Sequence, residues 1–248
     1  MPIAIVISAP PLDPVKKEAF IRALFDRIAP RYDRFNRLAS FGLDRRWRRR
    51  AIERLTLRPG MRILDLATGT GDLAHQAALT LVPLGFAVGC DPSFPMLRLA
   101  QEKLKASPAA SWHIRWIQGR AETLPFLDGA FDAATMGFAL RNVSDLGATF
   151  REFYRVIKPG GRLCLLEFGR PKNRALRLGH QLWLATGVPL IGLLATGILW
   201  PFVYLRRSIF RFLAPEEVIQ HLKAAGFTLV NAEPLTGGIV FLYTASHP

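Results

Sequence analysis

Short apolar runs that alternate with helical stretches constrain the fold of this chain more than any other feature of its sequence. Five runs have the length and composition of buried strands: 61–66, 86–91, 114–119, 131–138 and 162–168. Helical periodicity begins at Asp72 and recurs at 96–105 and 146–157, and a helix at 215–225 precedes two closing strand candidates, 227–232 and 238–245. Strands that alternate with helices predict a parallel sheet with helices on both faces.

The composition indicates one α/β domain with a basic surface. The chain has 248 residues, 50% of them hydrophobic, and a formal net charge of +14, so it can bury a large core and favours an anionic partner. Eight arginines between positions 31 and 50 concentrate this charge. Cys90 and Cys164 lie in predicted strands, which indicates buried thiols rather than a disulfide or metal site. The amino terminus has no secretory signal, so a cytoplasmic location is the default.

A glycine-rich loop at 65–72 follows the first predicted strand. Gly69 and Gly71 let the backbone approach a ligand where a Cβ would collide, and parallel sheets bind nucleotides at this edge. The spacing also satisfies the dinucleotide-binding pattern, so alone it does not separate NAD from other nucleotides. Asp65 favours S-adenosylmethionine, because a carboxylate suits a cationic amino group and suits a pyrophosphate poorly. Asp91 can accept both ribose hydroxyls of either ligand, and turn or cap chemistry is the alternative role for both carboxylates.

Four segments, spread over most of the chain, share a pattern with one protein family. They are 25–36 with its Phe-Asp-x-Ile-Ala-x-x-Tyr-Asp-x-x-Asn pattern, continuing to Ser40 and Trp47; the loop 65–72; the segment Phe138-Ala139-Leu140-Arg141-Asn142; and 155–169 with its Lys-Pro-Gly-Gly turn. Taken together, they make the chain similar to the ubiquinone/menaquinone biosynthesis C-methyltransferase family, within the class I S-adenosylmethionine-dependent methyltransferases.

The resemblance implies an α/β fold: a Rossmann-like, seven-stranded, mostly parallel sheet with helices on both faces and an antiparallel final strand. N-terminal helices and an apolar helical insertion before the last two strands are added to that sheet. A single methyltransferase domain over 1–248 is then expected to have four parts: a helical substrate lid at 1–58, a cofactor-binding core at 59–169, an apolar cap or membrane-facing insertion at 170–213, and a C-terminal helix with a strand hairpin at 214–248.

The implied reaction is C-methylation of the ring of a prenylated quinone precursor: demethylmenaquinone, demethylphylloquinone or a ubiquinone precursor. A methyltransferase for another lipid or small molecule, such as a phospholipid amine, has similar motifs and remains the alternative. C-methylation needs an electron-rich ring, and so a group that accepts a phenolic proton or stabilises the phenolate. Residues 137–140 stand where base-methylating enzymes carry an Asn/Asp-Pro-Pro-aromatic motif, so no nucleic-acid substrate is expected.

The resemblance places Arg141, Asn142 and Tyr32 at the acceptor as catalytic residues. Arg141 would stabilise the phenolate or hold a proton-accepting water, and its alternative role is a salt-bridged helix cap near Asp145. No metal site is expected, because the five histidines are dispersed in the sequence. Thr70 would line the glycine loop and Gly137 would keep the end of the fourth strand open to the cofactor. Cofactor-binding roles are implied for eight residues: Asp65, Gly69, Thr70, Gly71, Asp91, Arg120, Ala121 and Gly137.

Three positions depart from the family's usual pattern. Phe35 replaces a Met, Asp44 replaces a His, and Arg120 replaces an Asp or Asn that meets the adenine amino group. A guanidinium has no hydrogen-bond acceptor. Arg120 should therefore stack on the adenine or point outward, leaving backbone groups to read the base.

A run of 28 residues, 178–205, contains no Asp, Glu, Lys or Arg and is long enough to span a bilayer. A single crossing would separate the last two strands from the sheet that they should join, so we expect a helical cap. This cap would dip into an anionic membrane surface or receive the prenyl tail of a quinone or quinol substrate, with flanking arginines at lipid phosphates. The predicted location is cytoplasmic and peripherally membrane-associated. A buried hairpin or a protein interface, such as that of a homodimer, is the alternative.

Overall fold

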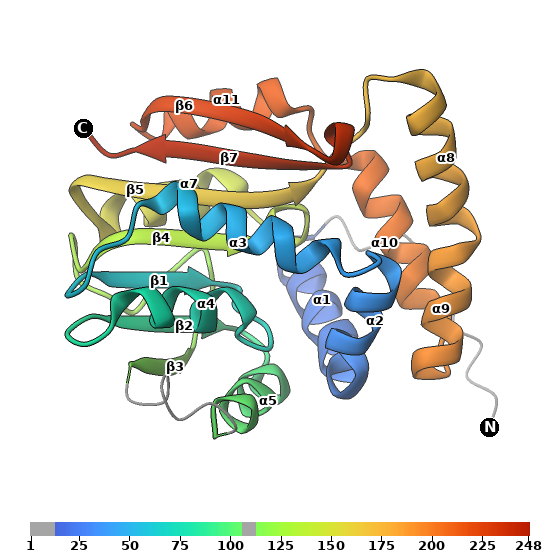
Figure 1. Cartoon of the computed structure of the whole chain (residues 1–248), viewed down its shortest axis with the longest axis horizontal. Coiled ribbons are helices and arrows are strands. Elements are labelled where there is room, and N and C mark those ends of the chain that lie inside the picture. Colours follow the sequence, from blue (N-terminus) through green and yellow to red (C-terminus); the bar gives the residue numbers. More distant parts are fainter. Residues whose placement is uncertain (1–12, 106–112) are drawn as a thin grey trace.

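The computed structural model describes residues 13–105 and 113–248. A seven-stranded sheet with the order β3-β2-β1-β4-β5-β7-β6 runs through the molecule (Figure 1). β7 is antiparallel to both of its neighbours, and the other pairs are parallel. The predicted fold class, with its antiparallel final strand, is therefore confirmed. The strands are β1 Arg62–Leu66, β2 Phe86–Asp91, β3 Ile114–Gln118, β4 Phe131–Gly137, β5 Ile157–Phe168, β6 Thr228–Leu235 and β7 Val240–Ser246.

Helices cover both faces of the sheet because successive side chains on each strand point to opposite faces. Ile63 and Cys164 belong to the core cluster under α3 and α4, whereas Leu64 and Cys90 belong to the cluster under α7 and α11. Both cysteines are buried free thiols, as predicted. The helices around the sheet are α3 Leu43–Leu55, α4 Asp72–Leu81, α5 Phe94–Lys105, α7 Leu146–Val156 and α11 Pro215–Ala224.

Two strands extend beyond their predicted bounds. β5 begins at Ile157 rather than at 162, because the strand continues through the Lys-Pro-Gly-Gly turn with a register shift against β4. β6 runs on to Leu235, past the predicted end at 232. Pro234 suggested a break, but β6 is an edge strand, where a proline is tolerated because one side of the strand needs no partner.

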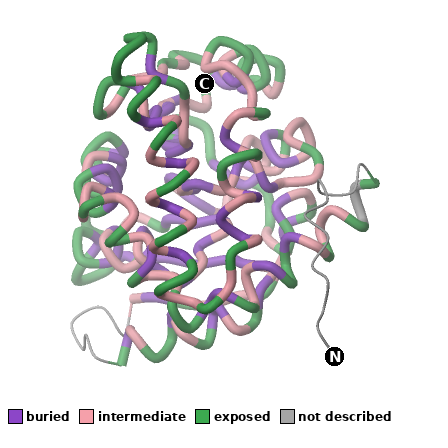
Figure 2. The backbone as a smooth tube through the Cα atoms, turned by 90° about the vertical axis from the view of Figure 1, so that its right-hand side faces the viewer, coloured by how far each residue is buried: buried purple, intermediate pink, exposed green. Residues whose placement is uncertain are grey.

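Two groups of helices lie beyond the carboxyl ends of the parallel strands (Figure 1). One is N-terminal and the other is the insertion between β5 and α11. The groups pack on each other: Phe35 shares a cluster with Leu184 and Phe202, and Leu24 shares another with Tyr204. Figure 2 shows this end of the molecule, where buried and exposed residues alternate along the helices. The helices are α1 Pro14–Ile28 and α2 Tyr32–Ala39, then α8 Arg174–Ala185, α9 Gly187–Thr196 and α10 Trp200–Arg211.

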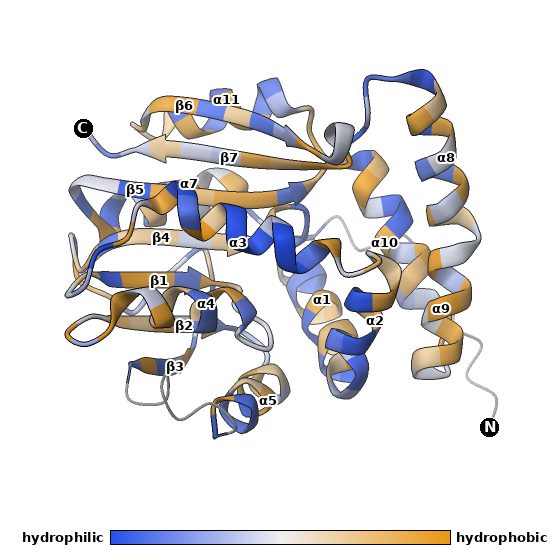
Figure 3. Cartoon of the chain, in the orientation of Figure 1, coloured by the Kyte–Doolittle hydropathy of each residue, from blue (hydrophilic) through white to orange (hydrophobic). Residues whose placement is uncertain are grey.

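Within the described residues, one helix is long and apolar enough to cross a membrane by length and composition, Arg174–Thr196, which combines α8 and α9. Only 22% of its most apolar window is buried, and Figure 3 shows mostly hydrophobic residues along α9. The strands before and after the insertion are β5 and β6, and β7 lies between them in the same sheet. The chain therefore leaves one sheet and returns to it, which a single membrane crossing would not allow.

Candidate active site

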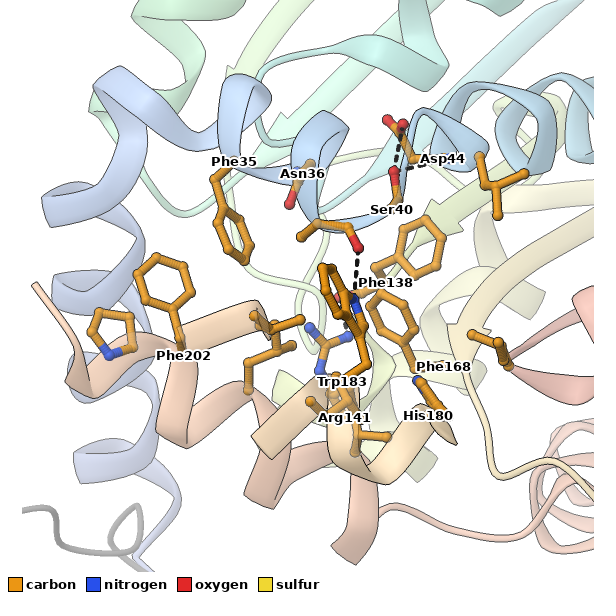
Figure 4. Close-up of a pocket in the computed structure, with 18 of the residues that line it drawn as sticks. Phe35, Asn36, Ser40, Asp44, Phe138, Arg141, Phe168, His180, Trp183 and Phe202 are labelled. Carbon is orange, nitrogen blue, oxygen red and sulfur yellow. Dashed lines mark hydrogen bonds between the residues drawn. The ribbon is translucent and has the colours of Figure 1, made fainter. Parts of the chain in front are cut away.

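Two adjoining cavities lie at the carboxyl ends of the parallel strands. The small cavity, of about 100 Å³, is bordered by the ends of β1, β2 and β4 and by α1. The large cavity, of about 320 Å³, lies between the N-terminal helices and the insertion (Figure 4). Four residues line both cavities and form their shared wall: Phe25, Tyr32, Phe138 and Asn142.

Five of the eight predicted cofactor residues line the small cavity. Asp91 is held there by two backbone N–H donors, from Gly69 at 2.8 Å and from Ser93 at 2.8 Å. Burial raises the pKa of Asp91 to about 6, because the charged form is partly desolvated. An added Cβ on Gly69 would meet nothing within 4 Å, which leaves room for a ligand at the loop. The five are Gly69, Asp91, Arg120, Ala121 and Gly137.

Asp65 lies beneath the glycine loop and lines neither cavity. Its Oδ2 accepts hydrogen bonds from the Thr68 hydroxyl at 2.5 Å and from the Ala74 N–H at 3.1 Å. Its Oδ1 is buried without a partner among the described residues. Burial raises the pKa of Asp65 to about 7. A buried acceptor without a donor is costly, so a donor that reached Oδ1 would stabilise this carboxylate. The predicted role of Asp65 at a cationic amino group stays a prediction.

Thr70 and Gly71 have structural contacts that the sequence did not predict. The Thr70 hydroxyl donates to Asp33 of α2 at 2.5 Å, and Lys103 binds the same carboxylate at 2.8 Å. An added Cβ on Gly71 would lie 2.4 Å from the Trp116 ring. Thr70 therefore ties the loop to the N-terminal helices. Packing against Trp116 and a φ of 82° are two structural reasons for glycine at position 71, and its predicted role at the cofactor stays a prediction.

Arg120 and Gly137 also have protein partners within the structure. The Arg120 guanidinium is half-exposed and binds Glu18 of α1 at 2.7 Å, and both residues line the small cavity. The two orientations that the sequence offered for Arg120 towards the adenine stay predictions. An added Cβ on Gly137 would lie 2.7 Å from Leu73 Cδ1. Contact with α4 is thus one reason for glycine at 137, beside the predicted opening to the cofactor.

Arg141 forms a buried ion pair on the wall of the large cavity. Its Nη1 donates to Glu167 Oε1 and to the Phe138 carbonyl, both at 2.6 Å, and its Nε donates to Ser208 at 3.3 Å. The side chains of Arg141 and Glu167 are 7% and 0% exposed. The alternative role near Asp145 is wrong, because Asp145 caps α7 and Glu167 pairs with Arg141. Among the described residues, Arg141 Nη2 has no hydrogen-bond partner.

Asn142 and Tyr32 complete the predicted catalytic group. Asn142 Oδ1 accepts a hydrogen bond from the Tyr204 hydroxyl at 3.1 Å. Burial raises the pKa of Tyr32, and the neighbouring Arg48 and a hydrogen bond with Asn36 partly offset that shift. The fold therefore brings Tyr32 to the same cavity as Arg141 and Asn142, more than 100 positions further along the chain.

Arg48 and His180 line the large cavity but were not predicted as site residues. The Arg48 guanidinium lies 5.3 Å from the centre of the Phe138 ring, and its Nε is buried without a hydrogen bond among the described residues. Its nearest acid is Asp72, at 3.6 Å. Arg48 was hidden in an arginine-rich stretch that indicated a basic surface. His180 gave no signal, because its partners in the cavity are remote in sequence.

Two of the departures from the family's pattern also lie in this cavity. The Phe35 ring packs against Phe202 of α10, with ring centres 4.3 Å apart. Asp44 is buried and accepts a hydrogen bond from the Ser40 hydroxyl at 3.0 Å. Phe35 therefore has a packing partner in this chain, and Asp44 has a hydrogen-bond partner (Figure 4).

Comparison with known proteins decides the family. The sequence profile of the ubiE/COQ5 methyltransferase family matches residues 14–247. The chain belongs to this family. Family members similar to it include "Demethylmenaquinone methyltransferase" from Thermus thermophilus, 42% identical over 225 residues that cover 91% of this chain and 100% of the relative. "Ubiquinone/menaquinone biosynthesis C-methyltransferase UbiE" from Syntrophotalea carbinolica is 44% identical over 224 residues, covering 90% and 92%.

Solved structures support the fold of this ubiE/COQ5 family member. The [4+2]-cyclase SpnF superimposes with a TM-score of 0.72 at 20% identity, covering 97% of this chain and 99% of the cyclase. A methyltransferase from Thermotoga maritima, described as S-adenosylmethionine-dependent, gives a TM-score of 0.63 at 20% identity, covering 92% and 100%. These likenesses show the fold alone. Family membership makes the protein a methyltransferase, and family and fold together imply S-adenosylmethionine as its cofactor.

Proposed function

We propose that this protein transfers a methyl group from S-adenosylmethionine to a ring carbon of a prenylated quinone precursor. The wall shared by the two cavities is the observation that carries the proposal. On one side lie the glycine loop and Asp91, and on the other an apolar cavity with Arg141 in its lining. A greasy aromatic acceptor would thus lie directly beside a polar donor, and this proximity supplies much of what methyl transfer needs. The names of the relatives support the same substrate class.

The residues present fit the donor. Asp91 would accept the ribose hydroxyls, and the unpaired Asp65 Oδ1 would compensate the charge of the amino group. Gly69 leaves space at the loop, and Ala121 borders the small cavity beside Arg120. Bound S-adenosylmethionine supplies a methyl group made electrophilic by its sulfonium.

Arg141 would stabilise the negative charge that develops on a ring oxygen of the acceptor. Glu167 and the Phe138 carbonyl fix the guanidinium, so little reorganisation is needed when charge appears. Aromatic side chains around it exclude water, which strengthens this interaction. Asn142 and Tyr32 border both cavities and would orient the ring toward the donor.

The four parts of the single domain over 1–248 have separate roles in this proposal. Residues 1–58, of which the structure describes 13–58, act as the substrate lid. Their helices line both cavities, and contacts from Thr70 to Asp33 and from Arg120 to Glu18 tie them to the core. Residues 59–169 hold the cofactor, and 214–248 complete the sheet. Residues 170–213 cover the acceptor and face the membrane.

Contact with an anionic membrane surface follows from the outer face of the insertion. Its exposed leucines lie between two groups of arginines, a combination that suits a lipid interface. The protein would then be cytoplasmic and peripherally membrane-associated, taking its prenylated substrate from the bilayer. The exposed leucines are Leu178, Leu182, Leu190, Leu193, Leu194 and Leu199. The flanking arginines are Arg174, Arg177, Arg206, Arg207 and Arg211.

The decisive experiment offers purified protein two acceptors with S-adenosylmethionine. One is a 1,4-naphthoquinol with a short prenyl chain, and the other is phosphatidylethanolamine in mixed micelles. We expect a naphthoquinol one methyl group heavier by mass spectrometry, with the new methyl on a ring carbon by NMR. Methylation of the amine and not of the naphthoquinol would instead support a phospholipid methyltransferase.

Calorimetry with S-adenosylhomocysteine tests the donor site separately from turnover. We expect binding by the wild-type protein and weaker binding by Asp91→Ala. If the protein binds S-adenosylhomocysteine but methylates no quinol, the donor site is supported and the proposed acceptor is refuted. Sedimentation analysis distinguishes a homodimer through the insertion from a monomer that binds vesicles.

A further inference from the structure

His180 is a buried imidazole that faces the large cavity. It belongs to α8, is 8% exposed, and lines the cavity opposite the α2–α3 residues Ser40 and Asp44 (Figure 4). Among the described residues, neither of its ring nitrogens has a hydrogen-bond partner. By contrast, the less buried His113 has its Nδ1 at 2.7 Å from the Gly85 carbonyl. The ring nitrogens are not among the fully buried polar atoms that lack a partner, so they remain accessible, and a ligand of the cavity that His180 lines is the expected partner.

The position of His180 follows from helix packing. Trp183, one turn further along α8, donates its indole N–H to the Ala39 carbonyl of α2 at 3.1 Å. Leu184 is buried in the cluster that joins the insertion to the N-terminal helices. Residues three and four positions apart lie on the same helix face, so these contacts direct His180 toward the cavity.

The chemistry of His180 differs from that of Arg141 and Arg48, the two cations on the cavity wall. Burial lowers the pKa of His180. The ring is therefore neutral near pH 7, with one nitrogen that donates and one that accepts. Arg141 and Arg48 can only donate. A hydroxyl group on the ring of the substrate donates a hydrogen bond as well as accepting them. The neutral imidazole provides a nitrogen that can accept the hydrogen bond from this hydroxyl.

We propose that His180 hydrogen-bonds a ring hydroxyl of the acceptor and so selects an acceptor with a free hydroxyl over one whose oxygen is alkylated. The inference rests on the proposed function, because it concerns the same cavity and substrate class. It assigns His180 as an acceptor-binding residue beside Arg141. Arg141 compensates charge on an oxygen, whereas His180 recognises the proton that a hydroxyl carries.

Two small probes test the proposal by binding alone. They are 1,4-dihydroxynaphthalene, kept reduced under argon, and 1,4-dimethoxynaphthalene, which has the same ring without a hydroxyl donor. Quenching of tryptophan fluorescence reports occupancy, because Trp183 lines the cavity. We expect the wild-type protein to bind the diol about tenfold more tightly than the ether, the value of one hydrogen bond to a buried group.

Substitutions then assign that preference to the imidazole. His180→Phe should lose the preference for the diol while its affinity for the ether stays within about twofold of wild type. His180→Met provides a second apolar variant, because the flexible methionine side chain adapts to irregular cavities. His180→Gln keeps a donor and an acceptor and should retain part of the preference. Leu184→Met is the matched control on the same helix, and it should change the two affinities by the same factor.

The outcomes separate this inference from the proposed function. If His180→Phe and His180→Met prefer the diol as strongly as wild type does, the role of His180 is refuted while the cavity remains an acceptor site. A wild-type protein that binds both probes equally also refutes it. If the wild-type protein binds neither probe, the proposal that the cavity holds an aromatic methyl acceptor is refuted. Loss of the preference in both apolar variants, with Leu184→Met unchanged, supports the proposal.

Discussion

Replacing Arg141 by alanine should affect both stability and catalysis, and a second substitution should separate the two effects. Arg141→Ala leaves Glu167, which is 0% exposed, without its cation. Breaking a buried ion pair on one side costs about 3–5 kcal/mol. For a chain of this size, such a loss lowers the melting temperature by roughly 6–20 °C.

The double variant Arg141→Ala/Glu167→Gln removes the unpaired charge. Glu167 accepts the backbone N–H of Arg141 on Oε2 at 3.1 Å and that of Phe168 on Oε1 at 2.8 Å. The single oxygen of a glutamine can keep one of these two hydrogen bonds, because its NH2 group only donates. We therefore expect the double variant to recover part of the lost melting temperature. Its catalytic defect should remain, because removing a donor to a developing oxyanion costs about 10²–10³-fold in kcat.

The assay combines differential scanning fluorimetry with turnover of the prenylated naphthoquinol measured by mass spectrometry. Turnover within a few-fold of wild type in either variant would show that Arg141 is not needed at the acceptor oxygen. A double variant that melts no higher than Arg141→Ala would contradict the stability argument. Recovery of both stability and turnover in the double variant would reduce Arg141 to a structural role.

Three further predictions concern the donor loop, its carboxylate and the insertion. Gly71→Ala should lower the urea midpoint of unfolding more than Gly69→Ala does. Both residues have a positive φ, but only at position 71 does an added Cβ meet the Trp116 ring, at 2.4 Å. Equal midpoints for the two variants would contradict this prediction. Burial raises the pKa of Asp65 from 3.8 to about 7, so the ligand-free protein should lose stability as the pH rises between these two values, since the folded state binds the proton more tightly. Asp65→Asn should flatten that part of the pH profile, and an unchanged slope would count against the assignment. Leu190→Ser/Leu194→Ser should reduce flotation with vesicles that contain phosphatidylglycerol while the melting temperature stays within about 2 °C, because both side chains are more than half-exposed; unchanged flotation would argue against the membrane-facing role.

The sheet, the glycine loop and the segment that we propose to bind the acceptor could all be predicted from the sequence. Strand and helix periodicity are local properties, so the alternation of elements and the carboxylates at the ends of β1 and β2 could be read directly. The Phe138–Asn142 segment was recognisable because it is continuous in the chain. Composition also showed that 178–205 has no charged residue, although not whether its helices face the acceptor, the solvent or both.

Only the tertiary structure decided the partners of these residues. Arg141 pairs with Glu167, 26 positions away, and not with the nearby Asp145. Trp183 binds Ala39 across 144 positions, and this contact helps to orient His180. Gly71 packs against Trp116, so its role in the loop depends on a residue two strands away. Local periodicity carries no information about which distant side chains meet, because that depends on how the helices pack beyond the strand ends.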